Sequence, residues 1–264
     1  MPSPSEITVP QLSRLIGLPG APALLDVRPP EEFNAEPLLL PAARQMPFRT
    51  VASWGGGYAG QRVVVYCRDG CEISQGTAAW LRHGGIEAQT LAGGFRAWRE
   101  ADAPLMRINR LPERDTAGRT TWVTRARPKV VRIACPWLIR RFIDPQAAFL
   151  FVAASEVPAV AERFKATPFD TGHGLWNDRD GTCTFDVMLE EFNLRTAPLS
   201  RLALIVRGAD TGRLDLSPQS AGLLAASLGY SRMYRDDLAQ LDAALPLYDA
   251  FYRWCRDATD ETHS

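Results

Sequence analysis

Residues 63–74 read Val-Val-Val-Tyr-Cys-Arg-Asp-Gly-Cys-Glu-Ile-Ser, and this stretch decides the fold of the first half of the chain. Its apolar start, residues 63–66, is typical of a strand buried on both faces of a parallel sheet. Cys67 follows directly in a short loop, and residues 74–83 have the pattern of a helix that ends at Gly84-Gly85. This arrangement aims backbone N–H groups and a helix N-terminus at the cysteine sulfur, and both favour the thiolate.

The segments around this stretch repeat the alternation of strand and helix. Residues 23–27 and 88–91 are predicted strands, and residues 95–101 are a predicted helix. The rhythm indicates an α/β domain with a parallel sheet and right-handed crossovers over residues 1–105. Residues 106–119 lack periodicity and are predicted to form a linker.

Residues 120–258 are predicted to form a second domain of α+β class that is largely helical. Residues 120–124 and 148–153 are predicted strands, and residues 135–143 are a predicted helix. Ser217-Pro218 is a predicted helix start with Gly229 as its stop, and residues 235–256 are helical with Pro246 as a break or kink.

The bulk composition predicts a cytoplasmic protein. Hydrophobic residues make up 46% and charged residues 23% of the 264 residues, which is typical of a folded globular chain. The formal net charge is zero, so no nucleic-acid partner is predicted. Apolar runs are too short to span a bilayer and no secretory signal is visible, so the five cysteines are expected to be reduced thiols.

The first half resembles the rhodanese family in three motifs around Cys67. Residues 24–33, Leu-Leu-Asp-Val-Arg-Pro-Pro-Glu-Glu-Phe, resemble the family's entry strand and turn. Residues 40–43 and 91–98 resemble its "I-P-G-A" turn and its closing "L-x-G-G-x-x-x-W". The resemblance implies that Cys67 is a persulfide-forming nucleophile that needs no cofactor, with a small-molecule sulfur donor and a thiol acceptor. It also implies a substrate-binding loop made of Arg68, Asp69, Gly70, Cys71, Glu72 and Ile73.

Three loop positions depart from related families. Many rhodaneses carry a basic residue where this chain has Glu72, and an acidic side chain there repels a dianion such as thiosulfate. Cys71 is either a resolving thiol for a Cys67 persulfide or an incidental loop residue. Cysteine phosphatases need an arginine at the position of Ile73, so phosphatase chemistry is not predicted.

From residue 122 onward the chain resembles the C-terminal domain of bacterial chromate-resistance proteins, including the regulator called chromate-resistance protein B. The matching stretches are residues 122–129, 132–145, 183–186, 205–210 and 231–237. In the regulator this domain follows a DNA-binding segment. A rhodanese-like segment stands in that place here, so direct promoter binding is not implied.

Two candidate sites lie in the second half. Residues 107–141 hold ten Lys or Arg against two acids, and within them Arg132, Cys135 and Arg140 could bind a small oxyanion such as chromate. The alternative is solvated arginines with the cysteine packed inward. A second group could hold a divalent Mn, Fe or Zn ion, against the alternative of a solvated acidic loop; its residues are Asp170, His173, Asp186 and Glu190.

Two functions from different classes follow. The first is a sulfurtransferase that carries sulfane sulfur on Cys67 and acts in resistance to chromate or to oxidative and thiol stress. The second is a chromate- or metal-responsive redox sensor without turnover. An inactive rhodanese-like docking domain is disfavoured, because Cys67 is present.

Overall fold

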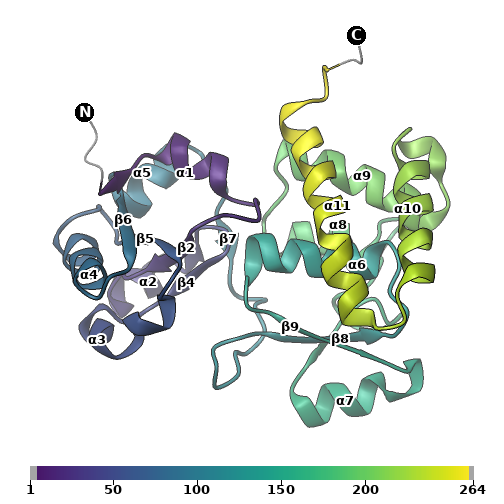
Figure 1. The fold of residues 1–264 in the computed structure, drawn as a ribbon, viewed down its shortest axis with the longest axis horizontal. Helices are drawn as coiled ribbons and strands as arrows, with labels where there is room; N and C mark the ends of the chain where they lie inside the picture. Colours follow the sequence, from purple (N-terminus) through teal and green to yellow (C-terminus); the bar gives the residue numbers. More distant parts are fainter. Residues whose placement is uncertain (1–4, 262–264) are drawn as a thin grey trace. The chain divides into compact units, whose positions relative to one another are not determined.

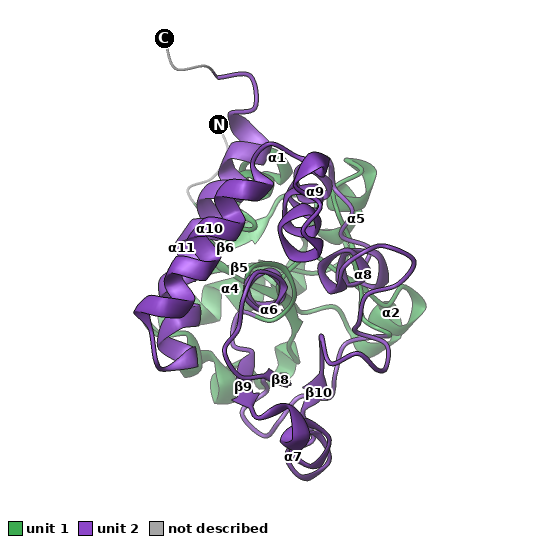
Figure 2. Ribbon diagram, turned by 90° about the vertical axis from the view of Figure 1, so that its right-hand side faces the viewer, with its two compact units in different colours: residues 1–109, 141–144 green, residues 110–140, 145–264 purple. Residues whose placement is uncertain are grey.

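The computed structural model describes residues 5–261, which divide into two compact units (Figure 2). Unit 1 contains residues 1–109 and 141–144, and unit 2 contains residues 110–140 and 145–264. Among the described residues, no helix combines the length and the apolar character needed to cross a membrane.

Unit 1 is built on a five-stranded sheet in which every neighbouring pair of strands is parallel. The strand order is β1-β6-β5-β2-β4. The bounds are β1 Glu6–Ile7, β2 Ala23–Asp26, β4 Ala43–Gln45, β5 Arg62–Tyr66 and β6 Glu87–Leu91. The predicted strands therefore form the centre of a parallel sheet, as the continuous apolar runs indicated.

Helices cover both faces of this sheet (Figure 1). Helices α1 (Val9–Leu15) and α5 (Gly94–Glu100) lie on one face, and α3 (Val51–Trp54) and α4 (Glu72–His83) lie on the other. Helix α2 (Pro30–Ala35) follows β2. Strands β3 (Leu38–Leu39) and β7 (Met106–Arg107) form a short antiparallel pair. Unit 1 therefore includes the first residues of the segment 106–119 that was predicted to be a linker.

Unit 2 contains a three-stranded parallel sheet in the order β10-β8-β9, and most of its remaining residues are helical. The strands are β8 Thr121–Arg125, β9 Ala148–Val152 and β10 Thr167–Pro168. The helices are α6 Val131–Leu138, α7 Val157–Phe164, α8 Thr184–Glu191, α9 Ala197–Thr211, α10 Ser220–Met233 and α11 Asp237–Asp257. The predicted class, an α/β domain followed by a largely helical α+β domain, is confirmed.

Two helix boundaries in unit 2 were predicted wrongly. Helix α10 begins at Ser220 rather than after Ser217, because residues 214–216 form a separate 3₁₀ turn whose exit includes Ser217. Gly229 lies inside α10 and does not end it. A helical glycine costs about 1 kcal/mol relative to alanine, and packing against α9 offsets that cost.

Two other predicted helices are longer or more regular than expected. Helix α6 begins at Val131, four residues before the predicted start, and continues as a π turn over Ile139–Ile143. Helix α11 runs without interruption through Pro246.

Candidate functional site

The candidate site lies at the carboxyl edge of the sheet in unit 1. Asp26 pairs in register with both Tyr66 and Gln45, so the residues that follow these three strands are Val27, Cys67 and Met46. From β2 the chain continues to β4, toward one edge of the sheet, whereas from β5 it continues to β6, toward the opposite edge. Ligands of open α/β sheets bind outside the carboxyl ends of the strands where the winding direction changes, and here that point is between β2 and β5.

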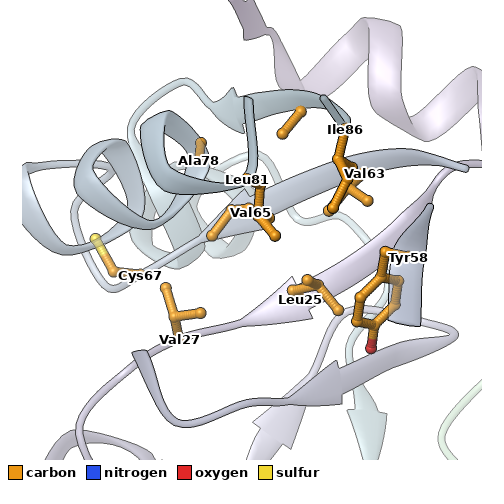
Figure 3. Close-up of a cluster of buried hydrophobic side chains, with 10 residues drawn as sticks. Leu25, Val27, Tyr58, Val63, Val65, Cys67, Ala78, Leu81 and Ile86 are labelled. Carbon is orange, nitrogen blue, oxygen red and sulfur yellow. The ribbon is translucent and has the colours of Figure 1, made fainter. Parts of the chain in front are cut away.

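Cys67 is buried at this edge, with 4% of its surface exposed (Figure 3). Its sulfur lies 3.2 Å from the Ser74 hydroxyl oxygen, and Ser74 belongs to the first turn of α4. The sulfur is therefore next to the N-terminus of a twelve-residue helix, which carries a partial positive charge.

The loop after Cys67 is held by the first turn of α5. Phe95 N–H donates to the Cys67 carbonyl and Arg96 N–H donates to the Arg68 carbonyl, each at 2.9 Å. Gly94 has a φ of +59°, and a Cβ atom there would lie 2.5 Å from both the Cys67 carbonyl oxygen and the Gly70 nitrogen. Only glycine permits this approach, so the closing Gly-Gly motif acts as a clamp on the loop.

The charged side chains of the loop are spread around its rim. Asp69 forms an ion pair with Arg96 at 3.3 Å, and Glu72 is exposed. Arg68 is also exposed and lines a small cavity of about 130 Å³. The structure therefore places no cationic cluster on the loop itself.

Cys71 is exposed on the same loop, with its sulfur 3.6 Å from the Asp69 carbonyl oxygen. Desolvation raises the pKa of the Cys71 thiol, and the negative charges of Cys67, Glu72 and Asp69 raise it further. This environment favours the protonated thiol, which is a poor nucleophile.

A buried ion pair between Asp26 and Arg28 stabilises the sheet edge beside Cys67. In the sequence, these two residues were visible only as part of a motif. The Arg28 guanidinium lies 2.6 Å from the Asp26 carboxylate, and the exposed fractions are 3% and 0%. Arg28 also donates to the Leu38 carbonyl at 2.7 Å and lies 3.9 Å from the centroid of the Phe95 ring. Burial raises the pKa of Asp26, while Arg28 opposes that shift. The pair ties β2 to α5, and so to the clamp on the loop.

A cavity of about 390 Å³ opens at this edge, and the sequence did not reveal it. Its wall is part apolar and part polar. The lining residues are Arg28, Pro30, Asn34, Gln45, Met46, Pro47, Phe48 and Arg49. Met46 and Phe48 pack against the same hydrophobic cluster that contains Cys67.

In unit 2, the structure does not gather the three residues suggested as an oxyanion site. Cys135 is fully buried, and burial raises the pKa of its thiol. Arg132 lies 3.3 Å from the Asp170 carboxylate, whereas Arg140 lies 2.8 Å from Asp242. Each arginine is therefore paired with a different carboxylate.

The four residues suggested as metal ligands are also separated. Asp170 is paired with two arginines, Asp186 accepts from the Cys183 N–H at 3.1 Å, and Glu190 is exposed beside Arg195. His173 lies exposed in the loop before α8. Within residues 5–261, no group of three or more His, Cys, Asp or Glu side chains is arranged to hold a metal ion.

Asp170 instead belongs to a polar cluster that links several elements of unit 2. Arg125 at the end of β8 and Arg132 in α6 both lie within 3.3 Å of the Asp170 carboxylate, and Thr184 of α8 donates to it at 3.3 Å. Asp210 is exposed by surface area, but partial desolvation of its carboxyl group raises its pKa to about 6, and the charge of Asp170 contributes. Perturbed carboxyl groups of this kind are common at functional sites and in structural ion-pair networks.

A cysteine at the carboxyl edge of a five-stranded parallel sheet, in a loop clamped by a Gly-Gly turn, is the arrangement expected of a rhodanese-like domain. The model of the rhodanese-like domain family matches residues 8–101. The model described as "ChrB, C-terminal domain" matches residues 122–255, which is half of the chain, and the chain belongs to this family.

One curated relative and several solved structures are similar to parts of the chain. Protein ChrB of Cupriavidus metallidurans is 32% identical over 146 residues, which cover 54% of this chain and 43% of the relative. The chain therefore spans less than half the length of that relative.

Two of the solved structures each match a little over a third of the chain. A rhodanese-related protein from Thermoplasma volcanium is 22% identical, with a TM-score of 0.33, and the match covers 38% of this chain and 95% of that one. A rhodanese-like domain protein from Staphylococcus aureus is 26% identical, with a TM-score of 0.32, over 36% of this chain and 90% of that one.

Proposed function

We propose that this chain is a sulfurtransferase in which Cys67 accepts a sulfane sulfur as a persulfide and passes it to a thiol. We further propose that this activity serves resistance to chromate or to related oxidative and thiol stress, on the strength of the ChrB-type domain. The observation that carries the first proposal is the position of the Cys67 sulfur beside Ser74 in the first turn of α4.

The chemistry needs only groups that this edge supplies. The Cys67 thiolate attacks the outer sulfur of the donor, a new sulfur–sulfur bond forms, and the donor's sulfane bond breaks with its electron pair on the leaving group. An acceptor thiolate then attacks the outer sulfur of the Cys67 persulfide and restores the Cys67 thiolate. The partial charge of the helix terminus favours the anion at both stages.

A comparison of wild type with Cys67→Ser tests the proposal. Cyanide serves as acceptor, and thiosulfate and polysulfide, which both carry sulfane sulfur, serve as donors. Wild type is expected to form product faster than Cys67→Ser with at least one donor, and equal rates with both would refute the proposal. Cys71→Ser is the matched control, and it is expected to retain activity within about twofold because the raised pKa of Cys71 keeps that thiol protonated.

A further inference from the structure

A cavity at the carboxyl edge of the sheet limits the kind of sulfur donor, an inference that rests on the proposed function. Its residues Met46 and Phe48 pack against the hydrophobic cluster that contains Cys67. We propose that the donor is an organic sulfane compound whose leaving group has a hydrocarbon body and a single negative charge. Phe48 and Arg49 would recognise these two parts.

The cavity and the nucleophile share one row of residues at the sheet edge. Val27 N–H donates to the Tyr66 carbonyl at 2.9 Å, and Met46 N–H donates to the Asp26 carbonyl at 2.8 Å. These bonds continue the parallel pairing one residue beyond the strands, so Met46, Val27 and Cys67 lie side by side. Adjacent strands are about 4.8 Å apart, which places Met46 about 10 Å from Cys67. A donor of several bonds' length, held at Met46 and Phe48, can present its sulfur to Cys67.

The wall of the cavity suits a hydrocarbon body. Its apolar part consists of Pro30, Met46, Pro47 and Phe48. A volume of 390 Å³ falls within the range of pockets that bind organic ligands, about 300–1,000 Å³, and is far larger than thiosulfate requires. A small hydrated dianion gains nothing from the apolar wall.

The charge of the cavity suits a monoanion. Arg49 is exposed, its guanidinium lies 5.1 Å from the Phe48 ring centroid, and no carboxylate pairs with it in the part of the chain that the structure describes. Arg28 also lines the cavity, but Asp26 neutralises it at 2.6 Å. On the nearby loop, the charges of Glu72 and Arg68 oppose each other. Within the lining of the cavity, one guanidinium without a carboxylate partner therefore faces the ligand, which matches a single negative charge on the donor.

The recognition segment is held in place without a ligand. The Pro47 carbonyl accepts from the Trp54 indole N–H at 2.9 Å and from the Thr50 N–H at 3.2 Å. These bonds fix the backbone on both sides of Phe48 and Arg49, so binding requires little ordering.

An aryl thiosulfonate is a donor of this class and balances the reaction. The Cys67 thiolate attacks its outer sulfur, the bond between that sulfur and the sulfonyl sulfur breaks, and the leaving sulfinate keeps the electron pair. Cyanide then attacks the outer sulfur of the persulfide, which releases thiocyanate and regenerates the thiolate.

The test compares benzenethiosulfonate, methanethiosulfonate and thiosulfate, with cyanide as acceptor. The expected kcat/KM for benzenethiosulfonate is about tenfold above that for methanethiosulfonate, with thiosulfate lowest, because an apolar group in a matching pocket contributes a factor of this size. Phe48→Ala should remove the preference for the aryl donor and leave methanethiosulfonate unchanged.

Arg49 variants test the charge separately. Arg49→Ala should lower kcat/KM for both thiosulfonates by a similar factor, and Arg49→Lys should recover part of it. The matched control is Arg62→Ala, since Arg62 is an exposed arginine at the opposite, amino end of β5. This control should leave all three donors unchanged.

The outcomes separate this inference from the proposed function. Turnover with thiosulfate preferred, or a Phe48→Ala variant that affects both thiosulfonates alike, would overturn the inference and leave the sulfurtransferase intact. If no donor is turned over, the proposed function fails, and calorimetric titration with benzenesulfinate still tests the pocket. Binding to wild type that weakens in Phe48→Ala and Arg49→Ala would support the ligand class, and an absence of binding would exclude it.

Discussion

The sulfur of Cys67 lies 3.2 Å from the hydroxyl oxygen of Ser74, and both residues are buried. Ser74 lies in the first turn of α4, and its hydroxyl group is a hydrogen-bond partner of the sulfur. It is a positioning residue, because it acts on the nucleophile and has no role of its own in the bond changes.

Ser74→Ala should lower kcat/KM for sulfur transfer by about tenfold, since a hydrogen bond to a charged group contributes about 1.5 kcal/mol. The rate at which iodoacetamide alkylates Cys67 at a fixed pH should fall with it, because the sulfur loses its hydrogen-bond partner. Circular dichroism checks that the fold is retained. Alkylation at the wild-type rate would show that Ser74 does not act on the sulfur.

Gly94→Ala should disable the site by displacing the loop. The added Cβ would lie 2.5 Å from the Cys67 carbonyl oxygen, and the residue would also have to keep a positive φ. We expect loss of most sulfur-transfer activity and a lower unfolding midpoint in urea. Gly76→Ala is the matched control, because nothing lies within 4 Å of its Cβ position in α4. That variant should gain about 0.5–1 kcal/mol of stability, and equal behaviour of the two variants would contradict the clamp.

Arg28→Ala should destabilise unit 1 by about 3–5 kcal/mol, because it leaves the Asp26 carboxylate buried without its ion-pair partner. Urea unfolding of the variant measures the change. The double variant Asp26→Leu with Arg28→Met should recover much of the loss, since apolar replacement removes both charges. A double variant no more stable than Arg28→Ala would show that shape, and not charge, accounts for the effect.

Asp210 should make the stability of unit 2 depend on pH. Its pKa of about 6 lies above the value of about 3.9 for an unfolded aspartate, so the folded state holds the proton more tightly. The contribution of the Asp210 carboxyl to the free energy of unfolding is therefore fully present below about pH 4. It is lost as the pH rises through about 6.

Asp210→Asn stays neutral at every pH and should be more stable than wild type at pH 7.5, with the difference vanishing near pH 4. Urea titrations at both pH values, followed by tryptophan fluorescence, measure this. Asp170, Arg132 and Asp178 also act on the Asp210 carboxyl, so each must remain unchanged in the comparison. A variant less stable than wild type at pH 7.5 would contradict the assignment.

The sequence predicted the elements of unit 1 well because their signals are local. The apolar run before Cys67 and the glycines after residue 83 mark a strand and a helix without reference to other parts of the chain. The role of Gly94 depends on a contact with Cys67 that only the folded chain creates, so its motif was visible and its function as a clamp was not.

The cavity and the polar cluster could not be predicted for the same reason. Phe48 and Arg49 lie in a segment without periodicity, and they reach the site because β4 pairs with β2. In unit 2, the carboxylate of Asp170 suggested a metal ligand, but Arg125 and Arg132 come from elements about forty residues away and pair with it. Spacing along the chain cannot show which cation a carboxylate will meet.

The most direct test of the central claim is the intact mass of the protein after incubation with a sulfane donor and removal of excess donor. We predict that wild type gains the mass of one sulfur atom, that peptide mapping places it on Cys67, and that cyanide removes it with release of one thiocyanate. Cys71→Ser should gain the same mass and Cys67→Ser should not. A wild-type protein that gains no sulfur, or gains it equally in Cys67→Ser, would contradict the account.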